Sequence, residues 1–269
     1  MKIKVLTLEN KEKGERELPK QFREVVRPDL IRRAVLAIQS HKRQPYGADP
    51  EAGMKVSAEL SRRRRNYRGS YGIGISRVPR KILSRQGRRM NWVGALAPGT
   101  VGGRRAHPPK SEKVWDQKIN NKERRKAILS ALAATVNVDY VRARGHKVPD
   151  SYPFAVDDSI IDVKKTADVS KVLGALGLGE ELERTKERKV RAGIGKMRGR
   201  RYKKKTGPLI VVPKECDLMK SARNIPGLEV ARVDKLNAEL LAPGAQPGRL
   251  VIFTEGALDR MEKENLFAQ

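Results

Sequence analysis

Short apolar stretches separated by polar connections make up the first 45 residues. Residues 3–8 (IKVLTL) alternate between apolar and polar side chains, which predicts a β-strand, and residues 11–14 predict the turn after it. Pro28 is tolerated in the first turn of a helix, and Asp29 beside it complements the helix dipole. Apolar positions then recur at helical spacing, so we expect a helix that ends before Pro45. Its buried face would consist of Leu30, Ile31, Ala34, Val35 and Ile38.

Helical and strand patterns alternate through the chain after residue 111. Helices are predicted at residues 115–136, 163–173, 180–191, 215–223, 233–240 and 257–263. Strands are predicted at residues 136–141, 154–156, 209–212, 228–230 and 250–253. The run LIVV at 209–212 is typical of a strand buried on both faces of a parallel sheet. The alternation predicts an α/β fold, a three-layer sandwich around a mostly parallel sheet whose strand order stays open.

A different pattern fills residues 60–111, where neither a helical nor a strand period persists. This segment contains no Asp or Glu, has 14 Lys and Arg among 52 residues, and is rich in glycine. It cannot bury enough apolar surface to offset the entropy lost on ordering its backbone, so we expect a polyanion to order it. The sequence therefore predicts a globular α/β body at 1–45 and 111–269. An extended Arg/Gly-rich loop at 46–110 would be inserted after the first helix.

The distribution of charge separates two segments from the rest of the chain. The net charge is +28, of which residues 60–111 contribute +14. Residues 184–205 hold 12 basic side chains against one Glu and contribute +11, which leaves only +3 for the remaining 195 residues. A nearly neutral body with concentrated cationic segments is typical of a nucleic-acid-binding protein. Binding to a membrane surface would need a basic amphipathic helix, which the glycine content of 60–111 excludes.

Composition also limits the compartment and the kind of chemistry. The single Cys216 cannot form an internal disulfide or a CxxC metal site, which suits a reducing cytosol. No apolar run approaches the roughly 18 residues of a membrane span, and the N-terminus lacks the apolar core of a signal peptide. We therefore expect a cytoplasmic protein that does not contact a membrane.

Candidate catalytic motifs are weak. The string GIGKMRG at 193–199 lacks the spacing and the hydroxyl of a phosphate-binding loop, and no His lies near Cys216 in the sequence. Asp157, Asp158 and Asp162 are of the type that holds Mg²⁺ for phosphodiester cleavage, but an acidic turn before a helix explains them as well. We expect no active site and no metal site.

Aromatic and arginine side chains give the loop a more specific signal. Tyr67, Tyr71 and Trp92 lie among arginines in a segment that has no core to join, so stacking on unpaired bases is expected, at about 1–3 kcal/mol per base. Arginine outnumbers lysine 12 to 2 in residues 60–111. Guanidinium groups bind phosphates in a forked geometry and stack on bases, which favours specific RNA contacts over bulk charge.

Five long strings along the chain carry a resemblance to a known protein family. They are RGSYGIGISRVPR (68–80), KERRKAILSALAAT (122–135), RAGIGKMRGRRYKKKTGPLIVV (191–212), ARNIPGLEV (222–230) and LNAELLAPGAQPGRLVIFTEGAL (236–258). In these strings the sequence resembles the archaeal and eukaryotic branch of the ribosomal protein family known as the fourth protein of the large subunit. The resemblance extends over nearly the whole chain, without a large insertion or a missing element.

The resemblance implies a structural protein whose α/β body lies on the solvent side of the large subunit and whose loop is threaded into rRNA. It implies that the loop tip contributes to the wall of the peptide exit tunnel. Implied partners are large-subunit rRNA, neighbouring ribosomal proteins and the nascent peptide, without a cofactor beyond rRNA-associated Mg²⁺ and monovalent ions. No homo-oligomer is expected. The alternatives are a freestanding regulator that binds mRNA or DNA and, less favoured, an enzyme that processes nucleic acid.

Charge, aromatic character and the resemblance together select the candidate residues. The loop residues expected to bind rRNA are Arg62, Arg63, Arg64, Arg65, Tyr67, Arg68, Tyr71, Arg77, Arg80, Lys81, Arg85, Arg88, Arg89, Trp92, Arg104, Arg105 and His107. Those of the second basic segment are Lys196, Arg198, Arg200, Arg201, Lys203, Lys204 and Lys205. The residues expected to lie near the tunnel are Arg77, Val78, Pro79, Arg80, Arg88, Arg89, Met90, Asn91 and Trp92.

Overall fold

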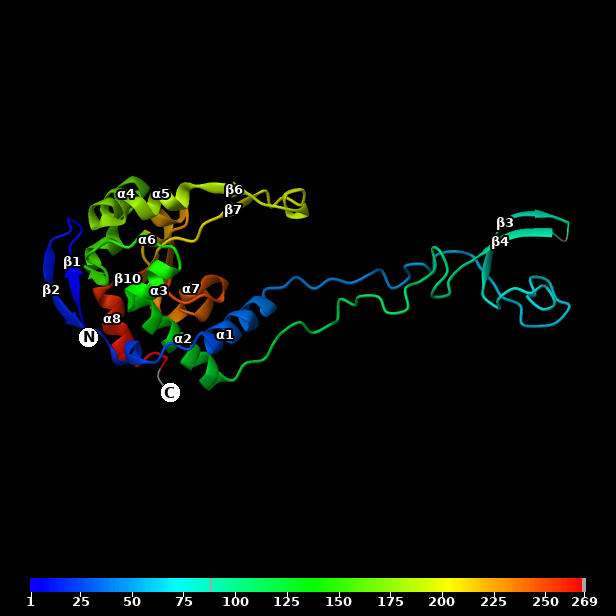
Figure 1. Ribbon diagram of the computed structural model, residues 1–269, viewed down its shortest axis with the longest axis horizontal. Coiled ribbons are helices and arrows are strands. Elements are labelled where there is room, and N and C mark those ends of the chain that lie inside the picture. Colours follow the sequence, from blue (N-terminus) through cyan, green and yellow to red (C-terminus); the bar gives the residue numbers. More distant parts are fainter. Residues whose placement is uncertain (88, 268–269) are drawn as a thin grey trace. The chain divides into compact units, whose positions relative to one another are not determined.

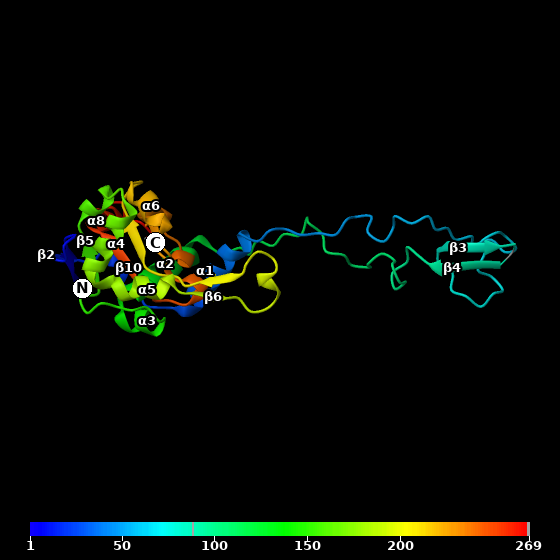
Figure 2. The same ribbon diagram turned by 90° about the horizontal axis from the view of Figure 1, so that it is seen from above.

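The computed structural model describes residues 1–87 and 89–267 of the chain. The chain divides into two compact units, one formed by Met1–Lys42 with Asp116–Gln269 and the other by Arg43–Trp115. We call the first the body and the second the loop unit. Figures 1 and 2 show the helices and the large sheet in the body, and a small hairpin in the loop unit.

A mixed sheet forms the centre of the body. In the described residues it has six strands, in the order β2-β1-β5-β10-β8-β9. Five of them run parallel: β1 (Lys2–Leu6), β5 (Phe154–Val156), β10 (Val251–Thr254), β8 (Leu209–Val212) and β9 (Glu229–Arg232). The sixth, β2 (Glu12–Glu17), pairs antiparallel with β1 at the edge. The predicted turn at 11–14 is therefore wrong after its first residue, because β2 has already begun at Glu12.

Helices cover both faces of this sheet. The larger ones are α1 (Pro28–His41), α2 (Asn121–Val136), α3 (Val138–Ala143), α4 (Thr166–Leu173), α5 (Gly179–Lys186) and α8 (Glu255–Lys263). Single turns form α6 (Leu218–Ser221) and α7 (Ala238–Leu241). The predicted α/β fold, with layers around a mostly parallel sheet, is confirmed.

The central strands show why the apolar runs are continuous. All four residues of β8 are buried, and so are all four of β10. Leu209 and Val211 belong to the core cluster with α1, α2 and α8, whereas Ile210 and Val212 belong to the cluster with α4 and α5. Because successive side chains of a strand point to opposite faces, a strand between two helical layers must be apolar throughout.

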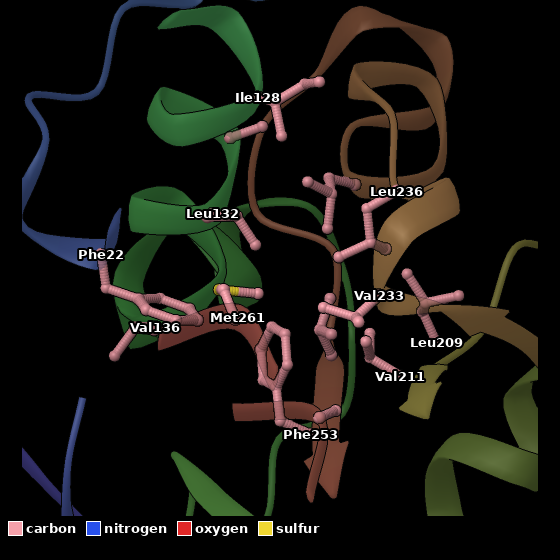
Figure 3. Close-up of a cluster of buried hydrophobic side chains, with 14 of the residues drawn as sticks. Phe22, Ile128, Leu132, Val136, Leu209, Val211, Val233, Leu236, Phe253 and Met261 are labelled. Carbon is pink, nitrogen blue, oxygen red and sulfur yellow. The ribbon is translucent and has the colours of Figure 1, made fainter. Parts of the chain in front are cut away.

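The core on the α1, α2 and α8 face is drawn in Figure 3. The rings of Phe22 and Phe253 meet edge to face, with their centroids 5.2 Å apart. Met261 of α8 is fully buried beside them, and Leu132 of α2 completes the contact layer. This core fixes the N-terminal segment, the sheet and the last helix to one another.

Other local predictions are also wrong, and three of them have an identifiable physical reason. Residues 136–141 form no strand, because the side chain of Asn137 accepts a hydrogen bond from the Asp139 backbone N–H and so starts α3. The helix predicted at 180–191 ends at Lys186, since the residues after it are charged and exposed and offer no apolar face. The helix predicted at 233–240 is divided into a 3₁₀ turn, Val233–Lys235, and α7, whose first turn is capped by the Asn237 side chain.

Among the described residues of the loop unit, helices or strands occur only at one hairpin. β3 (Arg80–Gln86) pairs antiparallel with β4 (Arg89–Gly94), whereas the sequence predicted no strand here. Gly87 has a φ of 57° in the connection, and Ile82 lies opposite Trp92 across the strands. Backbone pairing and this cross-strand contact are sufficient to form a hairpin without a hydrophobic core beneath it.

Glycines allow the two chain segments of the loop unit to approach each other. The Ala48 N–H donates to the Pro109 carbonyl oxygen at 2.9 Å. A Cβ added at Gly47 would lie 2.6 Å from the Ser111 nitrogen, and one added at Gly53 would lie 2.6 Å from the Arg104 backbone. Any larger residue at these two positions would push the segments apart.

Candidate nucleic-acid interface

The loop unit exposes nearly all of its side chains. Among its described residues only Ser70 and Ala95 are buried. Candidate residues that lie exposed to solvent are Arg62, Arg63, Arg64, Arg65, Tyr67, Tyr71, Arg77, Arg85, Arg89, Arg104, Arg105 and His107. Partly covered ones are Arg68, Arg80, Lys81 and Trp92, and Arg88 lies outside the described residues. A surface so basic and so little buried resembles an interface that lacks its other half.

Arginines lie over the faces of the loop aromatics. The Arg68 and Arg85 guanidinium carbons are 5.4 Å and 5.1 Å from the Tyr67 ring centroid. Arg85 also donates to the Tyr67 hydroxyl at 3.3 Å. Arg77 lies 5.2 Å from the ring centroid of Tyr71. Such cation–π contacts orient side chains that would otherwise move freely in water.

Arg80 is the most strongly positioned of these arginines. Its guanidinium carbon lies 5.3 Å from the Trp92 ring centroid, and its Nη atoms donate to Val78 O at 3.3 Å and to Ser76 Oγ at 3.2 Å. Arg80 begins β3 and Trp92 lies in β4, so the hairpin brings them together. The described residues predicted to lie near the tunnel occupy this hairpin and the three positions before it.

A cavity of about 710 Å³ lies beside these aromatics. Tyr67, Trp92, Met90 and Ile73 contribute apolar surface to it, while several arginines surround them. Aromatic faces together with guanidinium groups are the combination that accepts an unpaired nucleobase next to its phosphate.

Backbone strain is concentrated at the same cavity. Arg65 and Arg68 have φ values of 59° and 60°, in the left-handed region that a non-glycine residue seldom adopts. The Nε atom of Arg68 is buried without a hydrogen-bond partner. Strain and an unsatisfied donor of this kind recur at binding sites, where a ligand compensates for them.

Sequence reasoning missed an aromatic cluster near the ends of the loop unit. Tyr46 and Trp115 stack with ring centroids 5.6 Å apart, and Arg43 lies 3.9 Å and Lys113 4.4 Å from the Trp115 ring centroid. The same signal that marked Tyr67, an aromatic residue among cations, was present here on both sides of the loop.

The second basic segment forms a hairpin that projects from the end of α5 (Figure 1). β6 (Arg188–Val190) pairs antiparallel with β7 (Tyr202–Lys204). The connection carries Lys196, Arg198 and Arg200, all exposed. The remaining candidates, Arg201, Lys203, Lys204 and Lys205, lie on or beside β7. Exposed Ile194 and Met197 lie between these cations.

Asp157 and Asp158, two of the residues weighed as catalytic, have structural contacts instead. Asp157 caps a 3₁₀ turn and binds Lys13 Nζ at 2.6 Å, and the Lys13 ammonium holds the pKa of Asp157 at about 2. Asp158 accepts a hydrogen bond from the Gly256 backbone N–H at 2.9 Å. Burial raises the pKa of the Cys216 thiol, which makes this thiol less reactive. Within the described residues, no cluster of His, Cys, Asp or Glu is arranged to hold a metal ion.

The body contains no described helix that is long and apolar enough to cross a membrane, and neither does the loop unit.

Comparison with known proteins agrees with the geometry. The sequence model of the Ribosomal protein L4/L1 family matches residues 16–264. The large ribosomal subunit protein uL4 of Nanoarchaeum equitans is 52% identical over 268 residues, covering 99% of this chain and 100% of that protein. The uL4 proteins of Archaeoglobus fulgidus and Methanoculleus marisnigri are each 48% identical, over 96% and 98% of this chain and 97% and 99% of those proteins.

An α/β body with one cationic hairpin and a loop unit with another, in a chain this similar to ribosomal proteins, define a structural ribosomal protein rather than an enzyme. The match over residues 16–264 assigns the chain more narrowly: it belongs to the ribosomal protein L4/L1 family.

Proposed function

We propose that this protein is built into the large ribosomal subunit, where the loop unit binds rRNA and supports its assembly. The observation that carries the proposal is the contrast between the two units. The body buries a complete apolar core on both faces of its sheet, whereas the described loop unit buries only Ser70 and Ala95. A segment of this length without its own core needs a partner, and its charge selects a polyanion.

The loop cavity supports a specific mode of RNA binding. Tyr67 and Trp92 provide faces for unpaired bases, and the arginines over these rings provide positive charge for adjoining phosphates. RNA single strands and loops are bound in this way, because their bases are free to leave the helical stack. The loop unit would thus bridge several rRNA segments at once.

We further propose that the β3–β4 hairpin contributes to the wall of the peptide exit tunnel. The hairpin presents Arg80 and Trp92 as an ordered pair, and Arg89 and Asn91 lie exposed on β4, the strand of Trp92. Crosslinkers placed at exposed positions of residues 77–92 in assembled ribosomes would capture rRNA and nascent peptide. Capture of neither would overturn the assignment of the hairpin to the tunnel.

Sedimentation tests the proposed function against a freestanding regulator. In a cell extract the protein should travel with large subunits, whereas a regulator of mRNA or DNA would remain in the light fractions. The variant R62Q/R63Q/R64Q/R65Q removes four charges from the loop unit and should shift protein out of the subunit fraction. The control K164Q/K165Q/K171Q/K220Q removes four exposed charges from the body and should sediment as wild type. Equal loss in both variants would contradict a special role of the loop unit.

A further inference from the structure

A basic pocket lies on the body at the base of the β6–β7 hairpin. Its volume is about 410 Å³, and the residues that matter in its wall are Arg144, His146, Arg184, Lys189, Lys203 and Lys204. Three of these residues come from α5 and the segment after α3, and three come from the hairpin. The pocket lies entirely within the body and is separate from the loop cavity.

One carboxylate holds the inner wall of the pocket in place. Glu181 is fully buried, and its Oε1 accepts from His146 Nδ1 at 2.6 Å and from Arg184 Nη2 at 2.7 Å. Its Oε2 accepts from Arg184 Nε at 2.7 Å and from the Lys147 backbone N–H at 2.9 Å. Burial alone would raise the pKa of Glu181, but these hydrogen bonds outweigh it and hold the pKa at about 2. Glu181 is therefore ionised, and its charge is already neutralised by Arg184.

Arg144 has no such counter-charge. Its guanidinium donates to the backbone carbonyls of Pro243 and Gln246, and the described residues provide no carboxylate for it. Burial, with repulsion from Arg249 and Arg184, lowers the pKa of Arg144 to about 10. Arg144 therefore brings to the pocket wall a positive charge that no described carboxylate pairs with.

The hairpin adds to the same excess. Arg188 lies opposite Lys204, and Lys189 lies opposite Lys203, on two successive rungs of β6 and β7. Like charges directly opposite each other destabilise an antiparallel pair. The ion pair of Lys205 with Glu187 offsets only one charge at the edge of the pocket. The free protein thus holds together cations that repel one another, which is physically reasonable when an anion normally lies between them.

We propose that this pocket binds one phosphate of the RNA backbone, with Arg144, Arg184, Lys189 and Lys203 surrounding its oxygens. The proposal rests on the RNA-binding function inferred above and adds a defined site on the body. A backbone phosphate is favoured over free phosphate because the basic surface continues from the pocket along the hairpin to Lys196 and Arg198. A polyanion can cover this whole track, whereas a single small anion cannot.

The test uses the full-length protein and two matched variants. K189Q/K203Q removes two exposed charges from the pocket wall, and R198Q/R200Q removes two from the far end of the same hairpin. Inorganic phosphate is added at constant ionic strength, and the pKa of His146 is followed by NMR. Burial lowers the pKa of His146, Glu181 raises it, and repulsion from Arg184 and Arg144 lowers it. An added anion would offset this repulsion and should therefore raise the pKa of His146. We expect that rise in wild type and in R198Q/R200Q, and its loss in K189Q/K203Q.

RNA binding by the same proteins decides the source of the phosphate. In wild type an rRNA fragment should occupy the pocket in place of inorganic phosphate, so that added phosphate no longer changes the pKa of His146. K189Q/K203Q should then reduce the slope of log affinity against log salt by about one unit, because the pocket no longer neutralises one phosphate. An equal response of His146 in both variants would overturn the proposal that this pocket binds phosphate. A phosphate response with no competition by RNA would overturn the assignment to RNA, and failure of wild type to bind RNA at all would instead contradict the proposed function.

Discussion

Tyr67 illustrates how single side chains would prepare the loop unit for the RNA binding proposed above. Its ring lies under two guanidinium groups, and its hydroxyl accepts from Arg85. These contacts restrict the rotamers of the arginines before any ligand arrives, which lowers the entropy lost on binding. The buried cluster around Glu181 acts in the same way in the body, where it fixes Arg184 beside the basic pocket.

Replacing Tyr67 tests the stacking directly. Tyr67→Ala should weaken binding to an rRNA fragment by about 1–3 kcal/mol, roughly 5- to 150-fold, because a stacking surface is lost. Tyr67→Phe keeps the ring and loses only the hydrogen bond from Arg85, so it should retain most of the affinity. Filter binding at fixed salt measures both. Equal losses in the two variants would show that the hydroxyl, and not the ring, matters.

Glu181 makes the stability of the body depend on pH. Its pKa is about 2 in the folded protein, whereas an unfolded Glu titrates near 4.3. The resulting stabilisation, about 3 kcal/mol, is complete above the unfolded pKa and is lost as the pH falls through the folded pKa. Glu181→Gln should therefore lower the free energy of unfolding in urea most at pH 7, and the difference from wild type should narrow towards pH 2. A difference independent of pH would contradict this.

At the scale of elements, the sequence predicted best where packing demands a single pattern. Strands β8 and β10 and the helix from Pro28 were recognisable because their buried positions are apolar at the right spacing. Residues 136–141 were mistaken for a strand because a single side-chain cap, from Asn137, outweighs their apolar spacing. Boundaries set by caps and turns depend on individual hydrogen bonds, which periodicity does not reveal.

The candidate sites show the same limit. The cationic loop residues were predictable because they are contiguous in sequence. The pocket of Arg144, His146 and Arg184 was not, since the fold alone brings residues 40 positions apart to one wall. The Tyr46–Trp115 stack was missed for a related reason, because its two residues come from opposite ends of the loop unit.

Gly53 tests whether the two segments of the loop unit must lie close together. Gly53 and Gly72 have φ values of 78° and 80°, so alanine strains the backbone equally at both positions. At Gly53 the new Cβ would also lie 2.6 Å from the Arg104 backbone, whereas at Gly72 it would meet nothing within 4 Å. Gly53→Ala should therefore reduce incorporation into large subunits more than Gly72→Ala, as measured by gradient sedimentation. Equal incorporation would show that the close approach is dispensable.

At the scale of the whole molecule, charge and packing are divided between different parts of the chain. The body is nearly neutral outside the β6–β7 hairpin and carries the apolar core, whereas the loop unit carries charge and aromatic rings with almost no core. This division allows the body to fold by itself, while the loop unit, on the proposed function, would rely on RNA to neutralise and cover it. Both cationic hairpins would then bind rRNA, one through the loop cavity and one through the pocket at its base.

The salt dependence of RNA binding tests this account most directly. Binding of the full-length protein to an rRNA fragment should release counterions from about 6–10 phosphates, so its affinity should fall by about 10³–10⁵ between roughly 50 and 200 mM salt. Titrations at several salt concentrations give the slope of log affinity against log salt. A steep linear fall is the result predicted here. A flat profile would contradict it, because binding would then not depend on the cationic segments.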